Sequence, residues 1–592
     1  MSSIKNKTIS AYRRTKASLS FLSFFKKKAQ KQEDLDKKLV YSLSTRKIPN
    51  GEQIRHLHRF LNPREFLIVK VCVFLILISG SYLLYRFVSN HLEYSPLSGG
   101  KYIEGVVGYP QTINPLYATN HNVDDDLARL IYSSLFKYDN NGRLVTDLAE
   151  SYEVSENGLE YTVNLKPGVR WHDDSLLSAD DVVFTFEAIK NSDYRSSLRP
   201  SLSLASIEKI DDNKVKFVLS ETFSPFLESL TFGILPKNLW MNISPSAANV
   251  SDLNIKPIGS GPYKFSSLSK NKDGEIKDYS LVYNEDYYAK VPFIEEIQFK
   301  FFPSYEEAVK ALNDNKIDGL SFLPFAYRPS LLAINSLQVH ELSQSRLVSV
   351  FFNQEKNKAL VSKETRVALS QAIDKDALLQ EIFAGAYKRA DGPITSNNPA
   401  YNPAISRYDF DPMAASSYFR EHPLNLTLSV VDAGNNIAVA EKIKAYWELA
   451  GVQVSLNVIG SDQAQEAVRL RNFEAMIYGQ SVGSDPDVFA FWHSSQIGGQ
   501  GFNLAAYNNQ EADKILSEAR TEKDETVRFE KYRKFQELLT QDVPVIFLYS
   551  PSYTYIHSNN LKGFGVETVV DPADRFNSVS DWYLKTKKKI KW

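Results

Sequence analysis

The chain has 592 residues, a formal net charge of −1 and a single cysteine. At roughly 150 residues per domain it can form several domains or one large unit with several lobes. Its 43% hydrophobic and 23% charged residues are typical of a globular protein, which excludes a wholly disordered chain and a collagen. One cysteine excludes a disulfide scaffold and a zinc site built from several cysteines.

The small net charge results from an uneven distribution along the chain. Residues 1–65 carry 16 Lys/Arg and 5 Asp/Glu, whereas residues 89–592 carry 51 and 65. Between them, residues 66–88 read FLIVKVCVFLILISGSYLLYRFV, about the length that spans a bilayer. The basic excess before this stretch predicts a cytoplasmic N-terminus. No small-residue cleavage site follows, so we expect an uncleaved transmembrane signal anchor instead of a buried helix of a soluble protein.

The C-terminal part is therefore expected outside the cytoplasm, periplasmic or at the cell surface, after a linker at 89–100. Cys72 lies within the apolar stretch and follows no lipoprotein signal, so we interpret it as lipid-facing. Residues 586–592 are a second basic run, which we interpret as a tail. Because residues 89–592 are acidic, the sequence does not favour a nucleic-acid partner.

Beyond the linker, apolar strands alternate with helical segments, which is typical of α/β lobes. A strand, YIEGVVGYP, precedes a helix at about 124–135, and the three aspartates that open this helix suit a helix N-terminus. Asp139-Asn-Asn-Gly142 has the composition of a hairpin turn. Ser178 followed by Asp181 is a capping pattern for the helical run VVFTFEAI.

The alternation continues to the C-terminus, with no repeat of 20–50 residues that would predict a solenoid. The segments are EEAVKALNDNKIDGL, LVSVFFN, TRVALSQAI, KDALLQEIFAGA, LNLTLSVV, AVAEKIKAYWELAG, VQVSLNVIG, FEAMIYGQ, VRFEKYRKFQELLTQDV and PVIFLYS.

Catalytic and metal-binding patterns are mostly missing. The chain has no G-x-S-x-G, no H-E-x-x-H, no Walker loop and no dinucleotide fingerprint. Trp171-His172-Asp173-Asp174 contains reactive side chains, but its position at a strand end favours a structural role. We therefore expect no enzyme, no cofactor and no metal. A surface hydrolase, with a carboxylate pair in a cleft, is the weaker alternative.

Six blocks occur in a fixed order between about residues 100 and 585. They are YTVNLKPGVRWHDDSLLSADDVVFTFEAIK, PIGSGPYKF, LVYNEDYYAKVPFIEEIQFKFF, AVKALNDNKIDGL, FFN followed by TRVALSQAIDKDALL, and GQGFNLAAYNNQEADKIL. In this order they resemble the family 5 extracellular solute-binding proteins, the peptide-binding receptors of ABC importers. Gly259, Gly261 and Pro262 suit a tight turn beside a neighbouring element, and Asp374 suits a helix cap.

The resemblance implies an α/β fold with two lobes of the periplasmic-binding-protein type II, preceded here by one transmembrane helix. Lobe 1, with an inserted subdomain, would comprise 100–345 and 549–585, and lobe 2 would comprise 346–548. The chain would cross between the lobes near Ser349–Asn353 and Phe547–Pro551. In this family the lobes close on a ligand by a hinge motion.

The implied function is an extracytoplasmic receptor that binds an oligopeptide-like solute and delivers it to a permease. The expected partners are this small solute, an ABC permease with its ATPase subunits, and the membrane through residues 66–88. Two alternatives stay open: a ligand sensor on the same fold, and an importer receptor for a non-peptide solute such as a glycan or a metal chelate.

One departure from the family pattern concerns the ligand. In peptide receptors of the family, an aspartate a few residues before an Asp-Pro or Glu-Pro step binds the α-ammonium, because a desolvated cation needs a paired anion. Aligned on Asp485-Pro486, that position is Val482, which cannot hold an ammonium. Either Asp485 or Asp487 substitutes from a shifted loop, or the ligand lacks a free N-terminus, or it is another kind of solute. Asp485 can also be interpreted as the cap of a helix beginning at FAFW.

Ten residues are candidates for ligand contact because of their positions at strand ends, lobe crossings and family motifs. They are Asn114, Tyr117, Asn353, Gln480, Val482, Asp485, Trp492, Phe502, Asn503 and Tyr549. Gln480 stands where the family has a tryptophan after glycine, and Trp492 could equally pack its helix into lobe 2.

Overall fold

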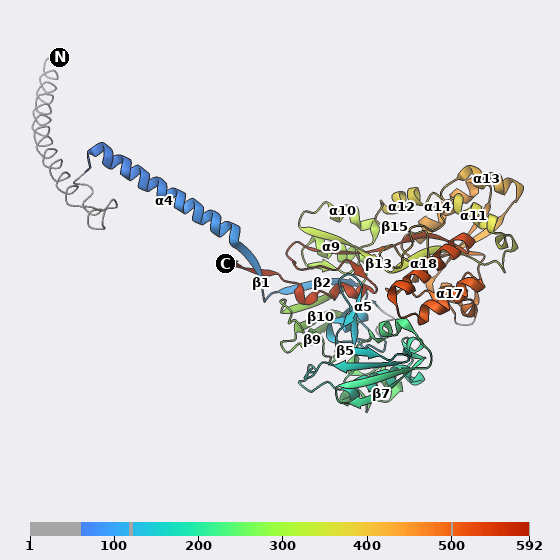
Figure 1. The fold of residues 1–592 in the computed structure, drawn as a ribbon, viewed down its shortest axis with the longest axis horizontal. Helices are drawn as coiled ribbons and strands as arrows, with labels where there is room; N and C mark the ends of the chain where they lie inside the picture. Colours follow the sequence, from blue (N-terminus) through green and yellow to red (C-terminus); the bar gives the residue numbers. More distant parts are fainter. Residues whose placement is uncertain (1–60, 118–121, 499–500, 591–592) are drawn as a thin grey trace, which may run out of the picture. The chain divides into compact units, whose positions relative to one another are not determined.

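The computed structural model describes residues 61–117, 122–498 and 501–590 (Figure 1). The chain divides into a smaller unit, residues 1–95 with 587–592, and a larger unit, residues 96–586. Most of the predicted cytoplasmic segment, and the last two residues of the predicted basic tail, lie outside the described residues.

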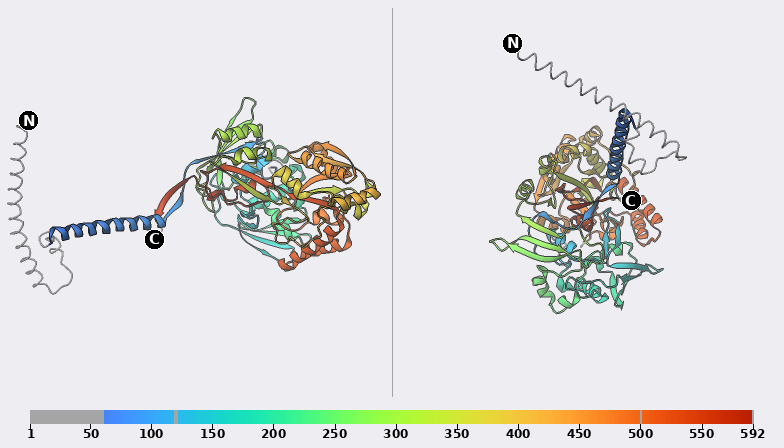
Figure 2. Two further views of the ribbon diagram at one scale, coloured as in Figure 1. Left: turned by 90° about the horizontal axis from the view of Figure 1, so that it is seen from above. Right: turned by 90° about the vertical axis from the view of Figure 1, so that its left-hand side faces the viewer.

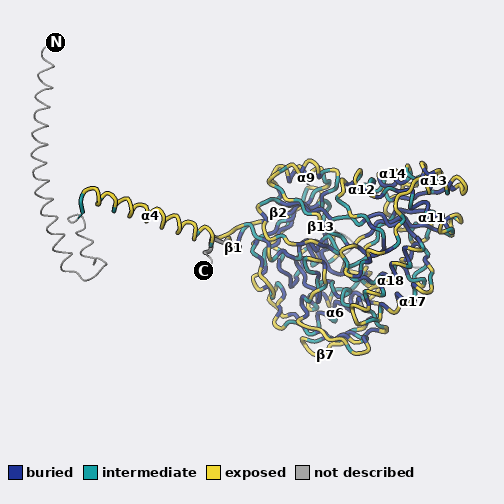
Figure 3. The backbone as a smooth tube through the Cα atoms, turned by 45° about the horizontal axis from the view of Figure 1, so that its top comes forward, coloured by how far each residue is buried: buried dark blue, intermediate teal, exposed yellow. Residues whose placement is uncertain are grey.

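The smaller unit contains helix α4 (Pro63–His91), which includes the predicted anchor. Its most apolar 18-residue window has a mean hydropathy of 2.4, and none of that window is buried (Figure 3). Cys72 is exposed on this helix. Strands β1 (Leu92–Leu97) and β22 (Lys585–Ile590) pair in a two-stranded sheet, so part of the basic C-terminal run is a strand. By length and composition, α4 suits either a membrane span or a signal sequence.

The larger unit is built on two mixed sheets. The first has eight strands in the order β21-β13-β20-β12-β2-β11-β10-β9. They are β2 (Lys101–Val107), β9 (Tyr263–Lys270), β10 (Ile276–Tyr283), β11 (Glu296–Phe302), β12 (Gly319–Leu320), β13 (Leu337–Gln344), β20 (Ser552–Ser558) and β21 (Thr568–Val569). β2 is central, pairs in parallel with β11 and β12, and is mostly buried.

The second sheet has six strands in the order β15-β19-β14-β18-β16-β17. They are β14 (Arg346–Phe352), β15 (Lys388–Arg389), β16 (Asn425–Val431), β17 (Gln453–Ile459), β18 (Ala475–Ser481) and β19 (Val545–Ser550). β16 pairs in parallel with β17 and β18, so these three strands end at one edge of the sheet. The segments of this sheet and its helices, yellow to orange-red, lie together at one side of the larger unit (Figures 1 and 2).

A separate antiparallel sheet, in the order β5-β6-β8-β7, is inserted between elements of the first sheet. Its strands are β5 (Ala149–Val154), β6 (Glu160–Leu165), β7 (Ala205–Asp211) and β8 (Lys214–Leu219), and α6 (Ala179–Lys190) packs on it. A hairpin of β3 (Phe136–Tyr138) and β4 (Leu144–Thr146) precedes this sheet.

The remaining helices lie between these strands in the chain. They are α5 (Asn122–Ile131), α7 (Lys237–Trp240), α8 (Pro245–Ala248), α9 (Tyr305–Asn313), α10 (Arg328–Leu332), α11 (Lys363–Gln371), α12 (Lys375–Phe383), α13 (Pro412–Glu421), α14 (Asn436–Leu449), α15 (Ser461–Leu470), α16 (Phe489–Trp492), α17 (Gln510–Thr521) and α18 (Glu525–Asp542). The alternation predicted from the sequence is therefore confirmed.

Local signals in the sequence predict several element ends correctly. The backbone N–H of Ser178 donates to Asp181 Oδ2 at 2.8 Å in a capping box that opens α6. Asp374 Oδ1 accepts the backbone N–H of Ala377 at 2.9 Å and caps α12. Gly142, in the predicted hairpin turn, has a φ of +75°, which glycine adopts at little cost.

The chain changes sheets twice, at Ser345 between β13 and β14 and at Pro551 between β19 and β20. The first crossing predicted from the sequence, Ser349–Asn353, is wrong, because β14 has already joined the second sheet at Arg346. The apolar run LVSVFFN continues as one strand through the predicted position, whereas the true crossing lies in the polar stretch before it, at the predicted lobe boundary 345/346.

His172 connects two of the family-like blocks. Its Nδ1 accepts the backbone N–H of Gly259 at 3.2 Å, and its Nε2 lies 3.1 Å from the carbonyl of Gly261. The first contact requires an unprotonated Nδ1, so the ring is neutral with its proton on Nε2. Burial lowers the pKa of His172 to about 4, which agrees with a neutral ring. These contacts support the structural role predicted for this histidine.

Candidate functional site

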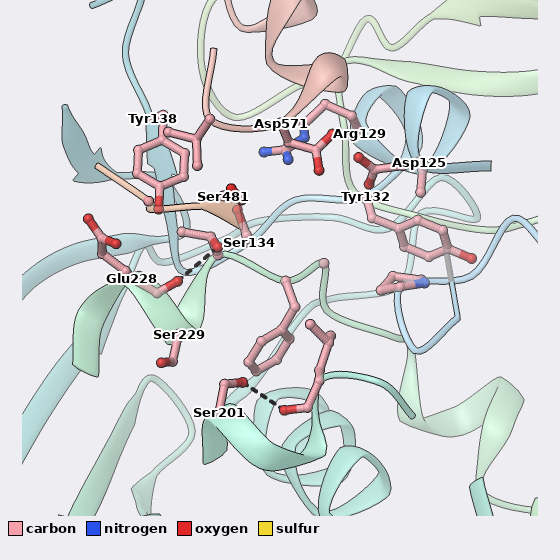
Figure 4. A pocket seen from close by; sticks show the side chains of 18 of the residues that line it. Asp125, Arg129, Tyr132, Ser134, Tyr138, Ser201, Glu228, Ser229, Ser481 and Asp571 are labelled. Carbon is pink, nitrogen blue, oxygen red and sulfur yellow. Dashed lines mark hydrogen bonds between the residues drawn. The ribbon is translucent and has the colours of Figure 1, made fainter. Parts of the chain in front are cut away.

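A cavity of about 590 Å³ lies beside α5, between segments that connect strands of the first sheet and the end of β18 in the second sheet (Figure 4). Most of its wall comes from α5, from the β3 region, from the 3₁₀ segment Ser224–Leu230 and from the chain after β21. The second sheet contributes Ser481 and Gly483, at the end of β18. The volume falls within the roughly 300–1,000 Å³ of small-molecule sites, and the carboxyl end of a parallel strand is a common position for a ligand.

Helix α5 presents one face to the cavity. Asp125, Ala128, Arg129 and, directly after the helix, Tyr132 are three or four residues apart, a spacing that places side chains on one side of a helix. Asp571, which follows β21 in the chain, lies beside Asp125 and Arg129 (Figure 4). The three consecutive aspartates at the start of α5 thus have different surroundings, and Asp125 faces the cavity.

Behind α5, Arg575 joins two carboxylates in the interior. Its Nη1 and Nη2 lie 2.5 and 2.6 Å from the two oxygens of Asp126, and its Nη2 lies 3.2 Å from Glu104 Oε1. Tyr555 donates to Glu104 Oε2 at 3.0 Å. Arg575 and Glu104 are fully buried. Burial is the main reason that the pKa of Glu104 rises to about 7.

Glu228 connects the two sides of the cavity. It comes from the Ser224–Leu230 segment, and its Oε1 accepts a hydrogen bond from Ser484 Oγ in the loop after β18. Asn398 holds that loop, because its Nδ2 donates to the carbonyl of Ser484 at 2.8 Å. Burial and the nearby Asp485 charge raise the pKa of Glu228 to about 7, although the Ser484 contact opposes this shift.

Glu228 is expected to make stability depend on pH. An acid whose pKa rises from 4.5 to about 7 on folding contributes its full stability below pH 4.5, and this contribution is lost as the pH rises from 4.5 through 7. Glu228→Gln should therefore be within about 1 kcal/mol of the native protein at pH 5 and gain about 1–3 kcal/mol on it between pH 5 and pH 8. Guanidinium chloride unfolding at both pH values measures this difference.

Glu156→Gln is the control, because Glu156 is an exposed carboxylate on a surface turn. A stability difference between Glu228→Gln and the native protein that is the same at pH 5 and pH 8 would contradict the prediction.

Asp485 and Asp487, the two carboxylates considered as substitutes for the missing aspartate, are both paired with arginines. Asp485 Oδ1 contacts Arg528 Nη2, and Asp487 Oδ2 lies 2.9 Å from Arg520 Nε. The interpretation of Asp485 as a helix cap is wrong, because α16 has Val488 at its N-cap position. Asp485 Oδ1 instead accepts the backbone N–H of Asp487 at 2.8 Å.

None of the ten predicted ligand residues is among the described residues that line the cavity. Val482 lies between Ser481 and Gly483, which do line it, and its N–H donates to the carbonyl of Ser345 at 2.8 Å. Asp485 follows in the same loop. Gln480 Nε2 donates to the carbonyl of Phe502 at 3.3 Å.

The other predicted residues have clear structural surroundings. Trp492 is buried against Tyr507 and Phe547, and Tyr549 is buried beside Phe383 and Tyr387. The side-chain amides of Asn114, Asn353 and Asn503 are buried and bond to neighbouring backbone or side chains. Burial raises the pKa of Tyr117 to about 12, and Phe502 is exposed. A ligand role for these residues stays a prediction.

Sequence reasoning missed the charged residues that do line the cavity: Asp125, Arg129, Glu228 and Asp571. The spacing of Asp125 and Arg129 on one predicted helix face was an available signal. Glu228 and Asp571 lie in segments with no chemical motif, and only the fold brings them to α5. Among the described residues, no group of three or more His, Cys, Asp or Glu side chains could hold a metal ion.

Comparison with known proteins gives one family. The model of the bacterial extracellular solute-binding proteins, family 5 (middle), matches residues 143–503, more than half of the chain. The oligopeptide-binding protein AppA of Bacillus subtilis is 28% identical over 516 residues, covering 83% of this chain and 92% of the relative. The dipeptide-binding protein of Escherichia coli is 25% identical over 507 residues, covering 80% and 93%.

Solved structures have the same fold. The structure of AppA from Bacillus subtilis in complex with a nonapeptide matches with a TM-score of 0.68 and 26% identity, covering 83% of this chain and all of that one. The ABC transporter substrate-binding protein CtaP of Listeria monocytogenes matches with a TM-score of 0.73 and 27% identity, covering 82% and 99%.

Proposed function

Because the chain belongs to family 5 of the bacterial extracellular solute-binding proteins, we propose that it captures a peptide outside the cytoplasm and delivers it to an ABC importer. The observation that carries the proposal is the cavity of about 590 Å³, whose wall combines apolar and charged side chains from α5 and the Ser224–Leu230 segment with Ser481 and Gly483 at the end of β18. Relatives named for oligopeptide and dipeptide binding support a peptide as the solute. Capture and release are binding steps, so this chain performs no chemistry.

We assign residues 100–345 and 549–585 to lobe 1 and residues 346–548 to lobe 2. The chain then passes between the lobes at Ser345 and at Pro551, and these two connections serve as the hinge. The contact between Glu228 and Ser484 bridges the lobes at the cavity, as expected of a closed state. A ligand favours this closed state only through its differential affinity for it.

We also propose that α4 anchors the protein in the membrane, with residues 1–65 in the cytoplasm and the lobes outside. The apolar surface of α4, none of which is buried, and the basic residues before it support this orientation. Cys72 would then face lipid. A tether keeps the receptor close to its permease and so raises the effective concentration of the pair.

A peptide ligand should raise the unfolding temperature of the full-length chain purified in detergent. A ligand present at 100 times its Kd stabilises the native state by about 2.7 kcal/mol. The probe is a pooled library of peptides of two to nine residues, with a mixture of free amino acids as the control. Absence of any shift with the peptide pool contradicts the peptide proposal.

A non-peptide solute is the second candidate. It is favoured by Val482 at the family's aspartate position and by a relative named for heme binding. Mass spectrometry of small molecules released from the protein as purified distinguishes the two candidates. We keep the ten positions taken from the family pattern as predicted contacts, Val482 and Asp485 first, since they lie in the loop that borders the cavity.

A further inference from the structure

The charges around α5 do not balance at the cavity. Arg575 is already engaged behind the helix by Asp126 and Glu104. Arg129 Nη1 lies 3.3 Å from Asp574 Oδ1, and Asp574 is fully buried. The two arginines are thus paired with three carboxylates before the carboxylates of the cavity wall are considered.

Asp125 and Asp571 are the two cavity-wall carboxylates near α5 that are not part of these arginine pairs. Asp125 Oδ2 is closed to solvent and has no hydrogen-bond partner among the described residues, an arrangement that costs free energy unless a ligand satisfies it. Burial and the charge of Asp571 raise the pKa of Asp125 well above its ordinary value, in spite of Arg129. Asp571 Oδ1 accepts the backbone N–H of Ala573 at 3.1 Å within the capping box that opens the 3₁₀ segment Pro572–Phe576. A carboxylate has about four acceptor positions, so Asp571 can also receive a ligand donor.

The rest of the wall adds no compensating cation. Among the described lining residues, the charged ones are Asp125, Glu228 and Asp571 against Arg129. Apolar side chains such as Ala128, Phe223 and Phe232 surround them, so water is partly displaced and electrostatic attraction is strengthened.

We propose that Asp125 and Asp571 together bind a primary ammonium group of the solute. The ammonium would donate to Asp125 Oδ2 and to Asp571, in a charge-assisted contact that a desolvated cation requires. This inference rests on the proposed peptide-receptor function and deepens it: the cation is held by lobe 1 and not by the lobe 2 position occupied by Val482. A peptide α-ammonium and a lysine ε-ammonium share this chemistry.

The test compares four peptide pools on the full-length chain: free or acetylated N-termini, each with or without lysine. Binding is measured by calorimetry and by thermal shift for the native chain, Asp125→Asn, Asp571→Asn and the control Asp286→Asn, whose side chain is exposed. We expect each cavity variant to weaken binding of free-amine pools about 10- to 100-fold, with little change for acetylated pools without lysine. If affinity falls only for pools with free N-termini, the bound group is the α-ammonium. If affinity falls only for pools that contain lysine, the bound group is the ε-ammonium of the side chain.

Three outcomes are informative about different proposals. If no pool stabilises the native chain, the peptide-receptor function itself fails. If pools bind but Asp125→Asn and Asp571→Asn bind them as the native chain does, only the ammonium site fails. If both variants bind the free-amine pools and the fully blocked pools more weakly by the same factor, the carboxylates do not act as ammonium receptors. Near-ultraviolet circular dichroism verifies the fold of each variant, and Asp571→Asn carries the test if Asp125→Asn does not fold.

Discussion

Replacing Arg575 by methionine is expected to lower the free energy of unfolding by about 3–5 kcal/mol, the cost of removing one partner from a buried charge network. Methionine fills a similar volume but leaves Asp126 and Glu104 buried without their cation. Both carboxyls must then be protonated for the fold to persist. The loss should therefore be larger at pH 8 than at pH 5, and denaturant unfolding at the two pH values measures it.

Arg143→Met is the matched control, because Arg143 is 74% exposed and pairs with Asp139 at 3.1 Å on the surface. An exposed pair of this kind contributes less than about 1 kcal/mol. Combining Arg575→Met with Asp126→Asn and Glu104→Gln should recover part of the lost stability, because no buried charge is left unpaired. A loss below about 1 kcal/mol for Arg575→Met alone would show that water reaches the network.

The sequence predicted the elements well where local chemistry decides them. Ser178 and Asp374 are side-chain caps, and their role depends only on the next few residues. The predicted segments LNLTLSVV and VQVSLNVIG contain β16 and β17. The predicted lobe boundary at 345/346 coincides with the change of sheet at Ser345, whereas the crossing placed at Ser349–Asn353 lies too far along the chain, because the pairing partners that define it are distant in sequence.

The candidate site was much less predictable. We chose Trp492, Asn503 and Tyr549 as candidates because of their positions in the family pattern. In the fold they serve packing and buried hydrogen bonds. Asp125 and Asp571 are far apart in the sequence of the larger unit. Asp125 comes from α5, near its start, and Asp571 from the chain after β21, near its end. Their proximity depends on how η9 (Pro572–Phe576) packs on α5, a long-range contact that no short motif encodes.

Gly259→Ala is expected to destabilise the protein by about 3 kcal/mol or more, above the usual range for overpacking. A Cβ at this position would lie 1.9 Å from the carbonyl oxygen of Ile131 and 2.6 Å from its carbon. These are backbone atoms at the end of α5, so no side-chain rotation relieves the clash. The helix, or the turn that His172 holds, must move.

The same displacement should weaken ligand binding, although Gly259 does not line the cavity. α5 presents Asp125 and Arg129, and a shift of its last turn changes their position relative to Asp571. Gly460→Ala is the control, because a Cβ there approaches only the end of the flexible Gln463 side chain, at 4.0 Å. Calorimetric unfolding and peptide-pool binding measure both effects. If Gly259→Ala unfolds at the native temperature, the close packing of this glycine on α5 does not constrain the fold. Loss of stability with unchanged affinity would mean instead that the turn yields and α5 keeps its place.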